Sequence, residues 1–232
     1  MRSRLTSPFT TMLAIVLATL VEASVLALGA AAPATAGVTS TFKAEVWADN
    51  WFALYVTGKL VGQDSVPITT ERSFNAETII FKASYPLTIA LVAKDFKQDD
   101  SGLEYIGTNR QQMGDGGIIA QITDTRTSKV VAATRGKWKV LVVHQAPLNP
   151  TCVTSGNPIA DCRSKITAEP ANWKTSSFAD STWRNATVYS PAQVGVKEGY
   201  STIRWSPTAS LVWSGDLQTD NTVLLRSTVK AP

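Results

Sequence analysis

The sequence has little histidine or cysteine, and this scarcity excludes several kinds of site. One histidine, His144, and two cysteines stand among 232 residues. A zinc site of the usual type needs several Cys or His ligands, and a Ser-His-Asp triad would have to use His144. The chain also contains no G-x-S-x-G segment. We therefore expect a protein that is not an enzyme.

Long runs of one charge are also missing. The chain has 22 Lys and Arg against 18 Asp and Glu, a formal net charge of +4. The basic residues are scattered, with no run of five or six. Proteins that bind phosphate backbones gather basic residues on one surface or segment. Nucleic acid is therefore not an expected partner.

The first residues have the layout of a secretory signal. Arg2 and Arg4 supply a positive start, and residues 12–32 form an apolar run. The stretch APATA then ends in small residues at Ala34 and Ala36. A positive start, an apolar run and a small-x-small end are typical of a cleaved signal peptide.

This leader sets the expected domain organisation. Residues 1–36 are predicted to be a secretory signal peptide, and residues 37–232 to be one exported domain, secreted or held at the cell surface. The alternative is an uncleaved anchor, because the apolar run is about the ~20 residues that span a bilayer. Glu22 in the middle of the run favours removal, after which no membrane insertion is expected.

The two cysteines, Cys152 and Cys162, lie in a segment rich in Pro, Gly, Ser and Asn. That composition marks a surface loop. In an exported protein such a pair is predicted to form a disulfide that closes the loop. A metal site at this pair would need further soft ligands.

Strand signals dominate the exported part. Residues 42–48 and 51–57 alternate in hydropathy, which indicates two neighbouring strands joined at Asp49–Asn50, and Gly58 then allows a hairpin. No window of a dozen residues has a helical apolar stripe. Many short strands between turn residues predict an all-β sandwich or barrel of antiparallel pairs. Further strand-like stretches are 77–83, 86–96, 117–124, 129–134, 137–145, 186–190, 200–206, 210–216 and 221–229.

Four segments carry a more specific pattern. They are ADNWFALYVTGKLVG (48–62), DGGIIAQITDTRTSKVVAATRGKWKV (115–140), NWKTSSFADSTWRNATVY (172–189) and SLVWSGDLQTDNTVLLRS (210–227). In this order they resemble the galactose-binding-domain-like module of bacterial and algal surface proteins and of glycoside hydrolase accessory domains. The resemblance covers nearly all of residues 42–228. It implies an antiparallel jelly-roll β-sandwich.

The chain departs from that family at two places. Thr57 stands where the family turn has Asn before Gly, which weakens a tight type I′ turn. Residues 94–117 form a polar insertion where the family passes more briefly into its next strand.

Aromatic residues in these four segments are expected to serve packing. Trp138 and Trp213 lie inside apolar strands, where indoles bury large areas. In FADSTW, Asp180 is expected to cap a turn together with Ser181, while the flanking Phe178 and Trp183 reach into the core.

The insertion holds the predicted ligand-binding residues. Sugar hydroxyls are recognised by planar polar side chains together with an aromatic face, and Gly114, Gly116 and Gly117 would let the backbone approach a ligand. A solvated loop, and core packing of the tryptophans, are the alternatives. The predicted binding residues are Tyr105, Asn109, Arg110, Gln112, Asp115, Trp51 and Trp205.

No cofactor is expected, but a structural Ca²⁺ held by Asp99 or Asp115 with backbone carbonyls is an alternative, although no EF-hand spacing supports it. The expected function is that of a lectin-like, non-catalytic module that binds a glycan of a cell surface or matrix polysaccharide. One alternative is an assembly protein that uses the sandwich for protein contacts. Another is an accessory domain acting with a separate glycoside hydrolase.

Overall fold

The protein is described from a computed structural model, which covers residues 39–230. The expected signal peptide, residues 1–36, lies outside the described residues. No helix within residues 39–230 is long and apolar enough to cross a membrane.

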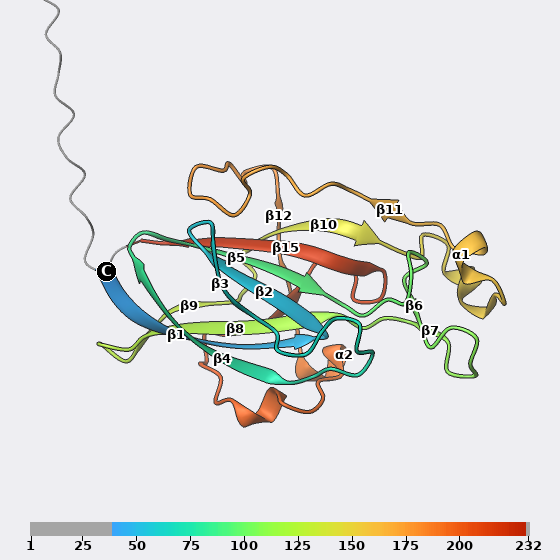
Figure 1. Ribbon diagram of the computed structural model, residues 1–232, viewed down its shortest axis with the longest axis horizontal. Coiled ribbons are helices and arrows are strands. Elements are labelled where there is room, and N and C mark those ends of the chain that lie inside the picture. The colour runs from blue at the N-terminus through green and yellow to red at the C-terminus, as the bar shows by residue number, and fades with distance from the viewer. Residues whose placement is uncertain (1–38, 231–232) are drawn as a thin grey trace, which may run out of the picture. The chain divides into compact units, whose positions relative to one another are not determined.

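Two antiparallel sheets face one another (Figure 1). The first has the order β13-β14-β8-β1-β4, with β9 paired to β8, and the second has the order β11-β10-β15-β5-β2-β3, with β12 paired to β10. The strands of the first sheet are β1 (Thr39–Asp49), β4 (Ala76–Ser84), β8 (Gly117–Asp124), β9 (Lys129–Ala133), β13 (Thr187–Tyr189) and β14 (Leu211–Trp213). Those of the second are β2 (Trp51–Val56), β3 (Lys59–Gln63), β5 (Leu87–Lys94), β10 (Lys139–Gln145), β11 (Lys165–Ile166), β12 (Arg184–Asn185) and β15 (Asp220–Val229).

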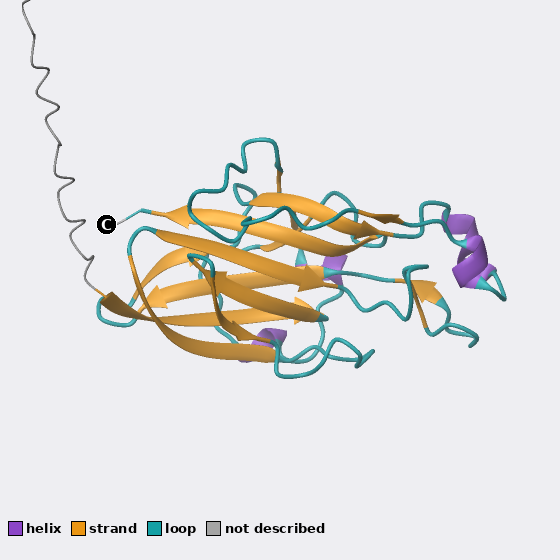
Figure 2. Cartoon of the chain, turned by 45° about the horizontal axis from the view of Figure 1, so that its top comes forward, coloured by secondary structure: helices purple, strands orange, loops and turns teal. Residues whose placement is uncertain are grey.

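The remaining elements are short and lie outside the two sheets. Strands β6 (Leu103–Glu104) and β7 (Gln112–Met113) pair with each other. Figure 2 shows how little helix the described chain contains. The helical elements are α1 (Pro158–Asp161), α2 (Pro191–Val194) and the 3-10 helices η1 (Pro150–Thr154) and η2 (Tyr200–Thr202).

The core fills the space between the sheets. Every second residue of a strand points to the same side, and this alternation supplies the buried faces of both sheets. Trp138 and Trp213 belong to this core and are buried, so their expected packing role is confirmed. Its members include Phe42, Ala44, Val46 and Ala48 of β1, Phe52, Leu54 and Val56 of β2, and Leu87, Ile89, Leu91 and Ala93 of β5.

The expected all-β content and antiparallel pairing are confirmed, with two local corrections. β1 and β2 are consecutive, but they do not pair: β1 lies between β4 and β8, and β2 lies between β3 and β5. The chain crosses from one sheet to the other at Asn50, after a cis Asp49–Asn50 peptide bond. The predicted strand 200–206 is wrong, because η2 forms there, with Thr202 N donating to the Gly199 carbonyl at 3.1 Å.

The predicted hairpin at Gly58 is confirmed. β2 and β3 pair up to Val56 and Lys59, and the two residues between them have positive φ, 48° at Thr57 and 83° at Gly58. Glycine adopts this region freely, whereas a β-branched residue rarely does. Thr57 is therefore a strained residue in a turn that the sequence places correctly.

The FADSTW segment covers the outer face of the second sheet. Phe178 and Trp183 pack edge to face, with ring centroids 5.6 Å apart, in a hydrophobic cluster on that face and not between the sheets. The Asp180 carboxylate does not cap its own turn; its Oδ2 accepts from Arg226 Nε at 2.9 Å. The buried Arg226 of β15 therefore outcompetes the local backbone for this carboxylate.

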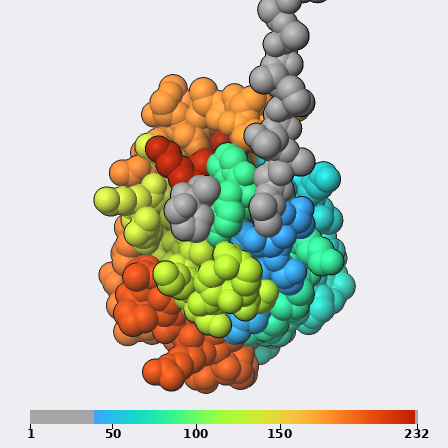
Figure 3. Space-filling view, turned by 90° about the vertical axis from the view of Figure 1, so that its left-hand side faces the viewer, coloured from blue at the N-terminus to red at the C-terminus, as the bar shows by residue number. Residues whose placement is uncertain are grey.

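The two ends of the sandwich differ in what they carry. At one end of the sandwich lie the start of β1, the last residues of β15 and the turn between β8 and β9. Figure 3 looks at this end. The opposite end carries the β6–β7 hairpin and α1 (Figure 1). We call this opposite end, formed by residues 94–117 and 146–163, the insertion end.

Candidate functional site

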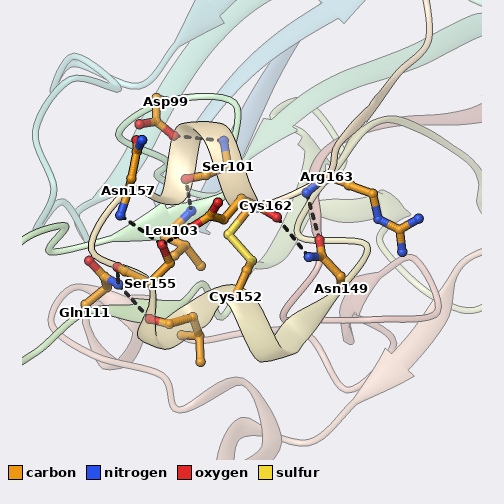
Figure 4. Close-up of a disulfide and its surroundings, with 12 residues drawn as sticks. Asp99, Ser101, Leu103, Gln111, Asn149, Cys152, Ser155, Asn157, Cys162 and Arg163 are labelled. Atoms are coloured by element: carbon orange, nitrogen blue, oxygen red, sulfur yellow. Dashed lines mark hydrogen bonds between the residues drawn. A yellow bond between two sulfur atoms is a disulfide. The ribbon is translucent and has the colours of Figure 1, made fainter.

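The insertion and the cysteine loop form one unit at the insertion end. The predicted Cys152–Cys162 disulfide is confirmed (Figure 4). It packs against Leu103, Ile106 and Met113 of the insertion in a small hydrophobic cluster. The disulfide therefore supports the β6–β7 hairpin as well as its own loop.

Hydrogen bonds join the same two segments. The Gln111 side chain donates from Nε2 to the carbonyls of Val153 at 2.6 Å and Ser155 at 2.9 Å (Figure 4). The Asn149 side chain closes the cysteine loop, donating to the Asp161 carbonyl at 2.9 Å and accepting from Arg163 N at 2.7 Å. The Gln111 bonds therefore tie the insertion to the cysteine loop, and the Asn149 bonds hold that loop closed.

The structure divides the predicted binding residues of the insertion into two groups. Tyr105 and Arg110 lie together on the surface, with the guanidinium 3.9 Å from the ring centroid, and Asn109 is exposed beside them in the chain. Gln112 instead donates to Glu104 at 2.9 Å, and Asp115 accepts from Lys197 at 2.9 Å.

The two predicted tryptophans lie on opposite outer faces of the sandwich. Trp51 belongs to the hydrophobic cluster on the second sheet, and Lys94 Nζ lies 5.1 Å from its ring centroid. Trp205 packs with Tyr200 in a cluster on the first sheet, and its Nε1 donates to the Tyr200 carbonyl at 2.9 Å. The two indoles therefore cannot contact one sugar ring together.

An open cavity of about 420 Å³ lies where the insertion leaves β5. Trp51 pairs with Lys94 across β2 and β5, and Lys94 pairs with Thr222 across β5 and β15, so these three side chains form a row on the outer face. Sequence reasoning did not select the residues that line this cavity, although residues 94–98 are the first positions of the insertion that it singled out. The lining residues are Ile68, Thr69, Lys94, Asp95, Phe96, Lys97, Gln98 and Thr222.

Charged groups next to this cavity are partly paired. Lys97 Nζ lies 2.6 Å from Asp100 Oδ1 and lowers the pKa of that carboxyl. Asp100 also lies 3.4 Å from His144 Nε2, and His144 Nδ1 is 3.0 Å from Asn221 Oδ1. Burial lowers the pKa of His144. Lys94 has no carboxylate partner within residues 39–230.

A second hollow of about 500 Å³ lies on the first sheet's side. Its aromatic ring, Phe74, is covered by Arg72 and Lys197, whose charged groups lie 5.2 and 4.4 Å from the ring centroid. Phe74 is also buried, whereas Trp51 is half-buried, so the Phe74 ring is less accessible for stacking than Trp51. The lining residues are Arg72, Phe74, Asn75, Ala76, Glu198, Gly199 and Thr202.

Three aspartates meet beneath the insertion. Asp49 ends β1 and pairs with Gly117, which places Asp115 beside it. Asn50 N donates to the Lys94 carbonyl at 2.9 Å, which brings Asp95 to the same place. One carboxylate oxygen from each aspartate lies within 4.8 Å of the others. Strand ends far apart in the sequence thus form one acidic cluster, Asp49, Asp95 and Asp115.

Burial dominates the electrostatics of this cluster. It raises the pKa of Asp49 to about 7 and that of Asp95 well above its ordinary value. The neighbouring Glu104 is also raised to about 7 by burial. Lys197 Nζ lies 2.9 Å from both Asp49 Oδ2 and Asp115 Oδ2. Burial lowers the pKa of Lys197, but these two ion pairs outweigh it and raise the pKa above its ordinary value.

The glycines of the insertion serve contacts within the protein, which corrects the expectation that they admit a ligand. A Cβ at Gly114 would lie 1.7 Å from Asp95 Oδ2, and one at Gly116 would lie 2.5 Å from the Trp213 ring. At Gly117 it would lie 2.6 Å from Val194. Asp99, the other expected calcium ligand, accepts from Ser101 N at 2.8 Å within its own turn.

Comparisons with models of protein families, with curated proteins and with solved structures gave no match to this chain.

Proposed function

We propose that this chain is a secreted or cell-surface, non-catalytic module that binds carbohydrate, with a galactose-binding-domain-like jelly-roll fold. The observation that supports this function is the open cavity of about 420 Å³ next to the row of Trp51, Lys94 and Thr222. Its size falls within the roughly 300–1,000 Å³ of small-ligand sites.

The chemistry of the cavity suits sugar hydroxyls. Lys94, Lys97, Gln98 and Thr222 contribute ammonium, amide and hydroxyl groups, which can all donate hydrogen bonds. Trp51 is partly exposed at the border and offers an aromatic face to the apolar side of a sugar ring. The proposed site therefore lies at the root of the insertion, and the Tyr105–Arg110 pair at its tip is the competing location.

Two further observations support export. The disulfide is of a kind that persists in oxidising compartments, and residues 1–36 have the sequence layout that predicts a signal peptide. The four sequence segments that resemble galactose-binding-like domains contribute strands to both sheets. This distribution is expected of segments that specify the whole sandwich.

The test is a glycan array followed by fluorescence titration of purified protein with the oligosaccharides that bind. Lys94→Ala and Trp51→Ala are expected to weaken binding at least tenfold, about 1.4 kcal/mol. Lys59→Ala, an exposed lysine in the β2–β3 hairpin, is the matched control and should bind as the wild type does. Arg110→Ala tests the tip.

The outcomes separate the alternatives. Binding that survives Lys94→Ala and is lost in Arg110→Ala places the site at the tip and refutes the root cavity. Folded protein that binds no glycan on the array overturns the carbohydrate function and favours the assembly role.

A further inference from the structure

The acidic cluster holds more buried carboxyl oxygens than its protein partners satisfy. Asp49 and Asp95 are 0% and 1% exposed. Asp49 Oδ1 and both carboxylate oxygens of Asp95 receive no hydrogen bond from any described residue. Lys197 supplies one positive charge against three aspartates. A buried carboxylate without a donor or counter-charge is strongly unfavourable.

The spacing of the carboxylates fits a single cation. Calcium binds oxygen ligands at about 2.3–2.6 Å, so two ligands of one ion lie at most roughly 5 Å apart. The three aspartates bring their oxygens within 4.8 Å of one another. The unpartnered oxygens of Asp95, which is almost fully buried, belong to this same group.

The ligand chemistry selects the kind of cation. The group consists of carboxylate oxygens, which favour hard ions over zinc or copper. Magnesium demands near-ideal octahedral geometry and keeps several waters, whereas calcium accepts six to eight oxygens in irregular arrangements. The Asp115 side chain is 37% exposed and gives the cluster access to solvent.

We propose that Asp49, Asp95 and Asp115 form a calcium-binding site that ties the ends of β1 and β5 to the start of β8, with Lys197 competing for the same oxygens. Lys197 Nζ lies 2.9 Å from Asp49 Oδ2 and from Asp115 Oδ2, so a bound ion has to displace its ammonium group from these oxygens. The inference does not depend on carbohydrate binding, since calcium is measured without any sugar.

The experiment is calorimetric titration of chelator-treated protein with CaCl₂ and MgCl₂ at pH 7.5, with thermal unfolding in parallel. We expect saturable binding of one Ca²⁺ per chain. At one hundred times Kd the melting temperature should rise by roughly 5–10 °C. Mg²⁺ should bind at least tenfold more weakly.

Variants decide which residues hold the ion. Asp95→Asn keeps the shape of the side chain and should abolish Ca²⁺ binding. Asp99→Asn makes the same change elsewhere in the insertion, at the other expected ligand, and should bind like the wild type. Lys197→Gln removes the competitor and should bind Ca²⁺ at least tenfold more tightly.

Several results would overturn the proposal. One is folded wild-type protein, verified by circular dichroism, with no heat and no melting shift up to 10 mM Ca²⁺, about ten times the Kd of the weakest extracellular calcium modules. Another is undiminished binding by Asp95→Asn. Should that variant not fold, Asp115→Asn, whose side chain is partly exposed, carries the same test, and undiminished binding there also refutes the site.

Discussion

Replacing Arg226 with methionine should destabilise the protein more than any ordinary surface substitution. Arg226 projects from β15 on the outer face of the second sheet and is 2% exposed. Its guanidinium donates to Asp180 at 2.9 Å and to the carbonyls of Trp173, Thr175 and Phe178. One side chain thus holds residues 173–180 against the sheet.

The magnitude follows from what the substitution leaves behind. Methionine fills much of the same volume but donates nothing, so the carboxylate and three carbonyls lose their donor. Breaking a buried ionic network from one side costs about 3–5 kcal/mol. Partial solvation of Asp180, whose side chain is 29% exposed, places the expected loss at the lower end, about 3 kcal/mol.

Urea unfolding followed by circular dichroism measures this loss directly, because a shift of the midpoint at constant slope reports stability alone. Asp180→Asn is the matched variant. It keeps an acceptor oxygen for Arg226 and should cost only about 1 kcal/mol. A loss below about 1 kcal/mol for Arg226→Met would show that the guanidinium does not hold this segment.

Three further substitutions have defined outcomes. Thr57→Asn should raise the free energy of unfolding by about 1 kcal/mol, since asparagine tolerates the φ of 48° better than threonine; lower stability in urea would show that the bond from Thr88 N to the Thr57 hydroxyl matters more. Burial raises the pKa of Asp64 to about 6, so its stabilising contribution is complete below about pH 4 and is lost as the pH rises through 6, a loss of at most about 3 kcal/mol. Asp64→Asn should remove this dependence between pH 4 and 7, and parallel stability curves for the two proteins would contradict the assignment. Replacing Cys152 and Cys162 together by serine should cost about 2–3 kcal/mol and speed hydrogen exchange in residues 103–113; unchanged exchange would show that the disulfide does not support the hairpin.

The order of residues along the chain predicted many of the strands of this protein, one hairpin and the disulfide. Alternation of apolar residues fixes the buried face of a strand without reference to any partner, and it located β1, β2, β5 and β15 correctly. A glycine after Thr57 sufficed for the hairpin, because a two-residue turn depends only on its own dihedral angles. The disulfide was equally predictable, since no third cysteine offered another pairing.

Strand pairing was decided only by the tertiary structure. β1 and β2 are separated by one residue, yet they lie in different sheets, and no local pattern distinguishes that crossing from a turn. The row of Trp51, Lys94 and Thr222 has the same origin, because it crosses three strands that are distant in the sequence. Polar residues of the insertion that look alike in the sequence therefore have different neighbours in the fold.

The acidic cluster shows this division most clearly. The sequence marks Asp115 as a candidate binding residue, but it places Asp49 in a turn and Asp95 where a predicted strand overlaps the insertion. The pairing of Asp49 with Gly117 and the bond from Asn50 to Lys94 bring the three carboxylates together. The sequence by itself determined which residues alternate, turn and cross-link, because those properties depend on neighbours in the chain. Only the tertiary structure decided which charges share a buried space, because that depends on which strand ends meet.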